Sequence, residues 1–270
     1  MYQDASLDVL SSITHRIAEA SCSQREPLSW VPRWSRKWDF RLDPLRLIKY
    51  GFDASLGAKI DQDLCGLISS DVLELRGLFI EELNRAVVTR QSEICDDLTS
   101  FLHEVSRFLG LDLMSEVFRD AAGVLCRVLV AGVDGNDRFV DDNIAHTFER
   151  FLRYFQERNE PPPTPRRLPA EAKEELLAIS DYRSAVDTAC DRRCLFTTAG
   201  GRMGLGPQTM RPGDVAVVLY GGRVPFILRH HKGTDDYEFI GECYIDGIMF
   251  GEAVEKHREE GREDVVFSIR

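Results

Sequence analysis

Apolar residues recur with helical spacing through the middle of the chain. In each repeat they fall three and four positions apart, which places them on one face of an α-helix. The spacing predicts helices in four segments: 94–109, 113–130, 144–155 and 170–190. A shorter stripe of the same kind runs through 5–20. Gly110 follows the first of the four segments and is the kind of residue at which a helix ends.

The pattern changes from helical to β after Cys190. Short β-prone runs alternate there with turn residues, and four of them predict strands: 195–198, 214–220, 224–231 and 237–244. Gly221 and Gly222 predict a tight hairpin turn within 214–231, with positive φ at both glycines. Residues 232–235 predict the next turn.

One strand is expected much earlier, at 71–81. Its β-prone residues surround Gly77, which predicts a bulge or bend at that position. We expect a helix to follow, through Leu83 and Val87. The strand could complete the sheet formed by the C-terminal runs.

These elements predict an α+β protein. A mainly helical body, residues 1–190, is expected to precede a small antiparallel β unit, residues 191–254, that forms a barrel-like or rolled sheet. Residues 255–270 are expected to be a charged tail, with an edge strand at Val265–Ile269. Residues 160–169 are rich in proline and predict an extended linker between two helices, or alternatively a polyproline ligand.

Charge narrows the classes of partner. The 270 residues carry a formal net charge of −11 at pH 7, whereas nucleic-acid binding draws on a clustered basic surface. Residues 30–49 do mix basic and aromatic side chains, as in proteins that bind single strands. An extended segment whose tryptophans fill the core fits the acidic balance better, so a nucleic-acid partner is not expected.

The chain shows no sign of export or membrane insertion. No run reaches the roughly 18 apolar residues of a membrane-spanning helix, and the first twenty residues lack the apolar core of a signal peptide. The seven cysteines are an odd number and lie mostly within apolar periodic runs. This usage predicts free thiols in a reducing compartment, and therefore a cytoplasmic location.

The glycine-rich stretch 200–207 is the first candidate for a binding site. A phosphate-binding loop needs free backbone N–H groups, a helix that begins at the loop and usually a lysine, and none of these is indicated here. Tight turning between strands is therefore the first interpretation. The alternative is a ligand-binding loop in which Arg202 binds an anion and Gly204 and Gly206 line the site.

The remaining candidates for chemistry are weak. Cys190 and Cys194 lack a second pair at metal-binding spacing, and Cys194 with His230 is one of many conceivable dyads. No GxSxG or HExxH motif occurs. Adjacent acids such as Glu81-Glu82 are interpreted as solvated surface. We therefore predict no catalytic residue, no metal site and no cofactor, and leave enzymatic activity open while favouring its absence.

Several segments together resemble the fungal heterokaryon-incompatibility (HET) family. The C-terminal block carries most of the resemblance, through Met203–Pro207, Pro212-Gly213-Asp214, Gly221–Phe226 and Gly241–Tyr244. Weaker similarities precede it, at Ser29–Ser35 with its W-x-P-x-W pattern, at Phe52–Ser55, at Leu73–Ile80 and at Arg127–Gly132. The resemblance extends over about residues 28–254.

The resemblance implies an intracellular fungal protein connected with non-self recognition and cell death. It also implies that an N-terminal HET domain would carry the toxicity, and the motifs of that domain are not found here. The chain therefore looks like the C-terminal region of a family member, and whether Met1 is the native start stays open. The family's C-terminal region supplies no catalytic residue to transfer.

Three hypotheses follow. The first is a non-enzymatic, truncated or regulatory HET-family protein that binds a protein partner, such as a full-length relative. The second is a small-molecule or nucleotide sensor that uses the 200–207 loop. The third is an accessory protein or enzyme of fungal secondary metabolism, since some members of the family are encoded near such genes.

Overall fold

The computed structural model describes most of the C-terminal half of the chain and shorter parts of the N-terminal half. The described residues are 7–12, 29–30, 50–61, 72–89, 105–110, 116–136, 138–141, 144–157, 170–191 and 193–270. The contacts within the chain divide it into two compact units. One comprises residues 1–86 and 196–270 and is called the sheet unit below; the other, residues 87–195, is called the helical unit.

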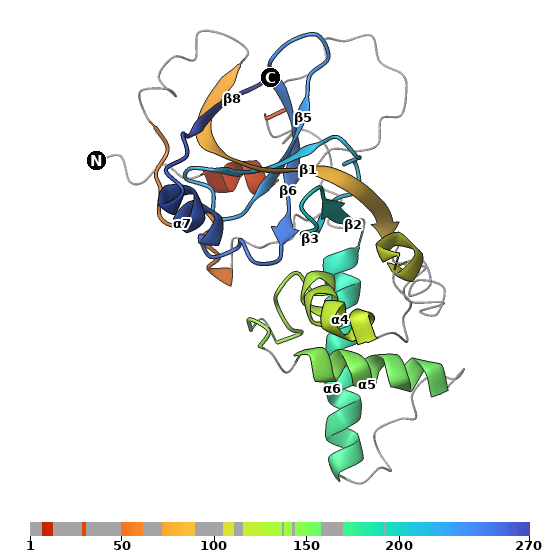
Figure 1. The fold of residues 1–270 in the computed structure, drawn as a ribbon. Helices are drawn as coiled ribbons and strands as arrows, with labels where there is room; N and C mark the ends of the chain where they lie inside the picture. The colour runs from red at the N-terminus through yellow and green to blue at the C-terminus, as the bar shows by residue number, and fades with distance from the viewer. Residues whose placement is uncertain are drawn as a thin grey trace, which may run out of the picture. The chain divides into compact units, whose positions relative to one another are not determined.

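The described part of the helical unit includes three long helices, α4 (Glu116–Leu129), α5 (Ile144–Glu157) and α6 (Ala170–Cys190) (Figure 1). They pack on one another through fully buried apolar side chains. Aromatic rings fill the centre: Phe151 lies edge-on to Tyr182 with ring centroids 5.1 Å apart, and Phe148 stacks against Phe151. The helices expected at 113–130, 144–155 and 170–190 are confirmed. Of the helix expected at 94–109, the described part, 105–109, is helical.

The sheet unit is built around β1 (Leu73–Thr89), which Figure 1 shows as one long curved strand. The expected strand at 71–81 is confirmed, but the helix expected through Leu83 and Val87 is wrong. The Leu83 N–H donates to the Asp214 carbonyl at 2.8 Å, and the Leu83 carbonyl accepts from Gly213 N–H at 2.9 Å. Because these hydrogen bonds continue the strand pairing, tertiary contacts override the local helical preference.

The bulge in β1 also lies elsewhere than expected. The pairing of β1 with its neighbour shifts register between Phe79 and Glu81, not at Gly77. At Gly77 a Cβ atom would lie 2.2 Å from the Val218 carbonyl oxygen. The glycine therefore permits a close approach of two backbones.

Seven further strands follow in the described part of the chain. They are β2 (Arg193–Thr198), β3 (Met203–Pro207), β4 (Val215–Leu219), β5 (Phe226–His230), β6 (Tyr237–Glu242), β7 (Tyr244–Ile245) and β8 (Val265–Ile269). All eight form one sheet in the order β4-β5-β6-β8-β1-β2-β3-β7. The β6–β8 pairing is parallel, whereas the other registers shown are antiparallel. The protein is thus α+β, with a mostly antiparallel sheet, as the sequence predicts.

Five of these strands pair in a closed circuit. Strand β4 pairs with β5, β5 with β6, β6 with β8 and β8 with β1, while β1 pairs back to β4. Apolar side chains from these strands are fully buried, among them Leu75, Phe226, Phe239 and Phe267. A segment from early in the sequence and one from the C-terminus are therefore both needed to complete the circuit.

Residues 255–270 are more ordered than a charged tail would be. Helix α7 (Glu252–Glu259) covers the first part, and after a turn β8 covers Val265–Ile269. The expected strand at Val265–Ile269 is present, but it lies between β6 and β1 in the order and not at an edge. Phe267 and Ile269 are buried there. The division at residues 190/191 into a helical body and a small β unit stays a prediction.

The β4–β5 hairpin is confirmed, although its turn differs from the one expected. Only Gly221 has positive φ, at 86°, and the connection runs from Tyr220 to Pro225. A Cβ atom at Gly221 would lie 2.4 Å from Cγ1 of Ile60, so close packing as well as backbone conformation requires glycine. The turn expected at 232–235 is confirmed, with Gly233 at φ 85°.

Short N-terminal segments are tied to the sheet unit by backbone hydrogen bonds. The Ala54 N–H donates to the Arg223 carbonyl at 2.9 Å, and the Asp53 N–H donates to the Met249 carbonyl at 3.1 Å. Residues Leu7–Ser12 form a 3₁₀ helix where an α-helix was expected over 5–20. The linker at 160–169, and residues 31–49 of the basic and aromatic stretch, lie outside the described residues.

Candidate functional site

The glycine-rich stretch 200–207 begins in a turn and continues as a buried strand. Residues Met203–Pro207 form β3, and Gly204 and Gly206 are buried within it. A Cβ atom at Gly204 would lie 2.5 Å from both the Phe196 ring and the Tyr244 carbonyl oxygen. One at Gly206 would lie 3.0 Å from the Met210 sulfur. Both glycines therefore make room for neighbouring groups. The expected turn between strands is present before Met203, whereas the expectation of a loop at 203–207 is wrong.

Arg202 lies just before β3, at the end of a tight turn that starts at Thr198. The turn is closed by the Thr198 N–H, which donates to the Arg202 carbonyl at 2.9 Å, and by the Arg202 N–H, which donates to the Thr198 hydroxyl at 3.0 Å. The Arg202 guanidinium forms an ion pair with Glu81, with Nε 3.4 Å from Oε1. Glu81 belongs to β1, so the arginine predicted to bind an anion is paired with a carboxylate of the chain itself.

Glu81 was interpreted as a solvated acid, and this is wrong. Its Oε2 accepts hydrogen bonds from the Thr198 hydroxyl and, at 2.8 Å, from the Gly200 N–H. No local pattern separates Glu81 from its neighbour Glu82. Only the pairing of β1 in the sheet brings it to this turn.

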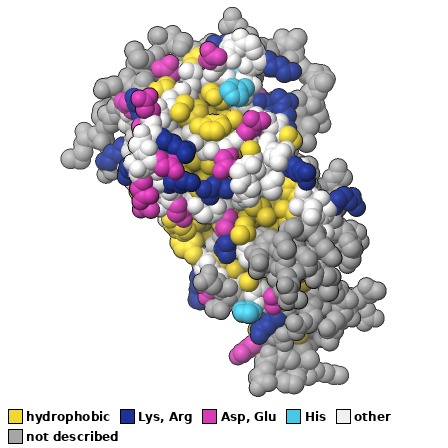
Figure 2. Space-filling view, in the orientation of Figure 1, with side chains coloured by type: hydrophobic (Ala, Val, Ile, Leu, Met, Phe, Trp, Pro, Cys, Tyr) yellow, Lys and Arg dark blue, Asp and Glu magenta, His cyan; other side chains and the backbone are white. Residues whose placement is uncertain are grey.

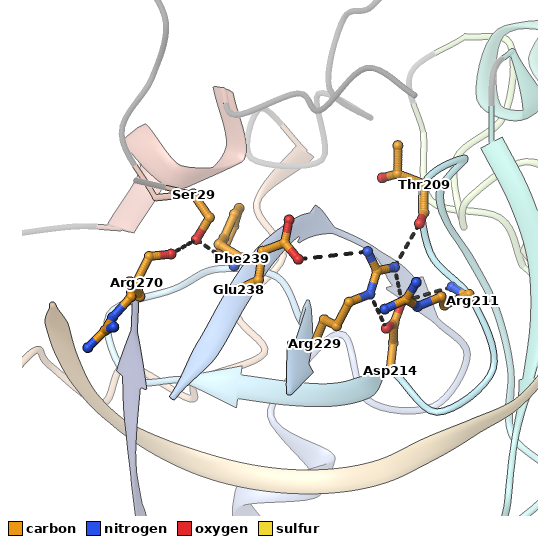
Figure 3. A network of polar contacts seen from close by, with 8 residues as sticks. All are labelled: Ser29, Thr209, Arg211, Asp214, Arg229, Glu238, Phe239 and Arg270. Carbon is orange, nitrogen blue, oxygen red and sulfur yellow. Dashed lines mark hydrogen bonds and ion pairs between the residues drawn. The ribbon is translucent and has the colours of Figure 1, made fainter. Parts of the chain in front are cut away.

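A second charged network lies around Asp214, which is 1% exposed (Figure 3). The Arg229 guanidinium binds its carboxylate at two points, Nε to Oδ1 at 2.7 Å and Nη2 to Oδ2 at 2.8 Å. Oδ2 also accepts the Arg211 N–H at 2.8 Å, and Arg229 Nη2 donates to the Thr209 carbonyl at 2.8 Å. Glu238 approaches the other side of the guanidinium, at 3.8 Å.

The sheet register explains this second network. Val215 pairs with Leu228, so the next position places Asp214 beside Arg229, and Arg229 in turn pairs with Glu238. The charges therefore alternate in sign across three adjacent strands. A two-point contact between arginine and carboxylate is among the strongest polar contacts in proteins. Asp214 belongs to the Pro212-Gly213-Asp214 motif. The sequence reveals this motif but does not indicate that Arg229 is the partner of Asp214.

The same view shows how Ser29 is held (Figure 3). The Ser29 N–H donates to the Arg270 carbonyl at 3.1 Å, and its hydroxyl accepts the Phe239 N–H at 2.8 Å. The hydroxyl also donates to the Arg270 carbonyl. These bonds attach Ser29, which precedes the W-x-P-x-W pattern, to Phe239 within β6 and to Arg270 directly after β8.

A third polar group joins α7 to the sheet. Asp264 Oδ1 accepts the Tyr220 hydroxyl at 2.7 Å and lies 3.2 Å from Nε2 of His257. Partial burial, with the hydrogen bond to Asp264, raises the pKa of Tyr220 to about 12. The tyrosine thus stays protonated and donates to Asp264 at neutral pH. Sequence analysis singled out none of these three residues.

The cysteine candidates lack the features of a nucleophile. Burial raises the pKa of Cys194 to about 12, so its thiol is protonated at neutral pH, whereas the reactive form is the thiolate. His230 is exposed, and its ring contacts the Tyr237 ring in a tilted arrangement, with centroids 4.5 Å apart. In the described part of the chain, no group of three or more His, Cys, Asp or Glu side chains is placed to hold a metal ion.

Buried thiols should make the protein less stable in alkali. Burial raises the pKa of Cys190 from 9.0 to about 12, so the folded state keeps a proton that the unfolded state loses. Its contribution to stability is complete below pH 9 and is lost progressively as the pH rises from 9 toward 12. Urea unfolding at pH 8 and pH 10 should therefore show a smaller loss of stability for Cys190→Ser than for the wild type. Equal losses would contradict this assignment.

Comparison with known proteins identifies the sheet region. Residues 165–266 match the family model of the Het-6 beta-barrel domain. A 67-residue segment is 39% identical to heterokaryon incompatibility protein 6, OR allele, of Neurospora crassa. Residues 165–266 therefore resemble a domain of the HET family. The matched segment is 24% of this chain and 10% of the Neurospora protein, and no solved structure matches the chain.

The HET-family match and the structural unit have different limits. The match starts at residue 165, before the first residue of α6, and ends at Val266, inside β8. It includes β2 to β7 and the Asp214–Arg229 pair, but neither β1 nor the bound segment at 50–61. The described residues contain no helix long and apolar enough to cross a membrane.

Proposed function

We propose that this chain acts in fungal non-self recognition, without enzymatic activity, by binding another protein. The match to the Het-6 domain and to the Neurospora incompatibility protein is the observation that carries this proposal. We further propose that the five-strand circuit is the β-barrel that the family description names. The partner would be a longer HET-family protein, acting in the cytoplasm.

The polar contacts of the sheet unit support a non-enzymatic role. Glu81, Asp214 and Asp264, the three acids at the networks described above, each bind two or more protein groups. A carboxylate held in this way positions the fold and is poorly placed to exchange protons with a substrate. Figure 2 shows acidic and basic side chains interspersed on the described part of one face, without a gathering of either sign.

Exposed apolar side chains on β1 and β8 are candidates for the binding surface. Phe79 is 48% exposed and Val265 is 38% exposed. Val265 pairs with Gly77, two positions before Phe79, so the two side chains lie on the same face as diagonal neighbours. Val266, which is 41% exposed, pairs with Arg76 and projects from the opposite face.

Two adjacent valines allow a matched test of this surface. We expect the Phe79→Ser, Val265→Ser variant to lose at least tenfold in affinity for a full-length HET-family relative, because it removes apolar area from the contact. Val266→Ser should bind as the wild type does. Affinities would be measured by biolayer interferometry with purified proteins, after circular dichroism shows that the variants are folded. Equal loss in both variants, or loss in neither, would refute the proposed surface.

Protein binding without chemistry has its own test. The wild-type chain would be expressed in a fungal host that carries the relative, and we expect it to change the cell-death response after fusion. The Phe79→Ser, Val265→Ser variant should leave that response unchanged. A response that persists in the binding-deficient variant would mean that the contact does not carry the function.

A further inference from the structure

The turn at residues 198–202 has the donors of an anion-binding site. Three of them converge on the Glu81 carboxylate: the Thr198 hydroxyl, the Gly200 N–H at 2.8 Å and the Arg202 guanidinium at 3.4 Å. They combine a hydroxyl, a backbone amide and a positive charge. Proteins bind carboxylate and phosphate groups with this combination of donors.

Glycine is required where the carboxylate enters the turn. A Cβ atom at Gly200 would lie 2.5 Å from Oε2 and 2.6 Å from Oε1 of Glu81. Gly201 has φ 85°, a conformation that turns the chain back toward Arg202, and its N–H donates to the Thr198 carbonyl at 3.0 Å. The glycines that suggested a ligand-binding loop therefore do admit an anion, at Gly200 and not at Gly204 or Gly206.

We propose that the 198–202 turn is an oxyanion-binding site whose resident ligand is the side chain of Glu81. An external carboxylate or phosphate would use the same three donors once Glu81 is removed. This site uses other residues than the proposed protein-binding surface at Phe79 and Val265. The inference does not depend on that surface. If the chain senses an anionic ligand at this turn, that ligand must first displace the Glu81 side chain.

The resident carboxylate should keep free anions out of the wild-type site. Glu81 is held on β1, which hydrogen-bonds to the turn through the Ala199 N–H and the Glu82 carbonyl at 2.9 Å. A tethered group competes as if present at millimolar or higher concentration. Free anions at millimolar concentration therefore should not stabilise the wild-type protein.

Removing the resident ligand tests the proposal. We expect 20 mM inorganic phosphate to raise the melting temperature of Glu81→Ala by about 2–4 °C relative to sodium chloride of equal ionic strength. Acetate in a parallel titration distinguishes a site that takes carboxylates from one that prefers phosphate. The wild type and Glu82→Ala, which loses a neighbouring carboxylate that is exposed, should show no specific shift. Arg202→Ala added to Glu81→Ala should abolish the shift.

The proposal would be overturned if neither anion stabilises Glu81→Ala, or if Glu82→Ala or the double variant responds equally. If Glu81→Ala does not fold, Glu81→Gln replaces it, because the amide keeps the shape and removes the charge. The amide resonance of Gly200 is then followed during a phosphate titration. A saturable shift at Gly200 supports the site, and an unmoved resonance overturns it.

Discussion

Asp214→Asn should destabilise the protein by about 3–5 kcal/mol, one of the largest effects expected of a single substitution in this chain. The carboxylate is buried and binds Arg229 at two points, and it also accepts the Arg211 N–H. The amide keeps the size of the side chain but leaves the Arg229 guanidinium, only 15% exposed, without its full counter-charge. The change would be measured as the free energy of unfolding in urea at pH 7.

Asp235→Asn is the matched control for that substitution. Asp235 is exposed in the turn between β5 and β6, so the same chemical change there should alter stability by less than about 0.5 kcal/mol. A second variant, Arg229→Met, completes a double-mutant cycle with Asp214→Asn. If the combined variant is more stable than Asp214→Asn alone, the unpaired guanidinium is the cause of the loss. Strictly additive effects would show that the two side chains do not act as a pair.

Sequence analysis located the helices well because their pattern is local. Helix α6 spans Ala170–Cys190, where the expectation was 170–190, and α4 spans Glu116–Leu129 within the expected 113–130. Apolar spacing of three and four residues is a property of the segment itself. Burial of residues such as Leu125 and Val186 then follows from the stripe that the sequence already displays.

The second half of β1 shows where this approach fails. Leu83 is buried, and its backbone pairs with Gly213 and Asp214, about 130 residues later in the chain. No local pattern encodes such a partner, and an isolated leucine among polar residues fits a helix equally well. The same limit applies to β3, whose residues were interpreted as part of a tight turn between strands, and glycine is unfavourable within strands. Close packing against Phe196 and Tyr244 overrides that preference.

The candidate site could be predicted only in part. Arg202 was singled out as an anion-binding residue, and the structure shows it beside a carboxylate at 3.4 Å. Whether it binds a ligand stays a prediction. Glu81 could not be recognised, because adjacent acids at the surface share its pattern and its role arises from strand pairing. The pairing of Asp214 with Arg229 could not be predicted either, although strands β4 and β5 were both expected, because it depends on their register.

Gly77→Ala should cost about 3 kcal/mol or more, because the new atom would meet backbone and not a movable side chain. Its Cβ would lie 2.2 Å from the Val218 carbonyl oxygen and 2.9 Å from Cα of Leu219. Strands β1 and β4 would have to separate where Gly77 pairs with Leu219, and the β1–β8 pairing through Val265 shares the same residue. One methyl group thus disturbs two ladders of the five-strand circuit at once.

Gly123→Ala is the control that separates this steric effect from a general effect of replacing glycine. Gly123 lies within α4. Apart from its chain neighbours and the nearby helix backbone, the described atom that its Cβ would meet is Nη1 of Arg127, at 3.8 Å. Alanine favours the helix there, so stability should rise by about 0.5–1 kcal/mol. Urea unfolding followed by circular dichroism measures both variants. If Gly77→Ala is as stable as the wild type, β1 and β4 do not approach as closely as described. The pairing of β1 with β4, which closes the five-strand circuit, would then be contradicted.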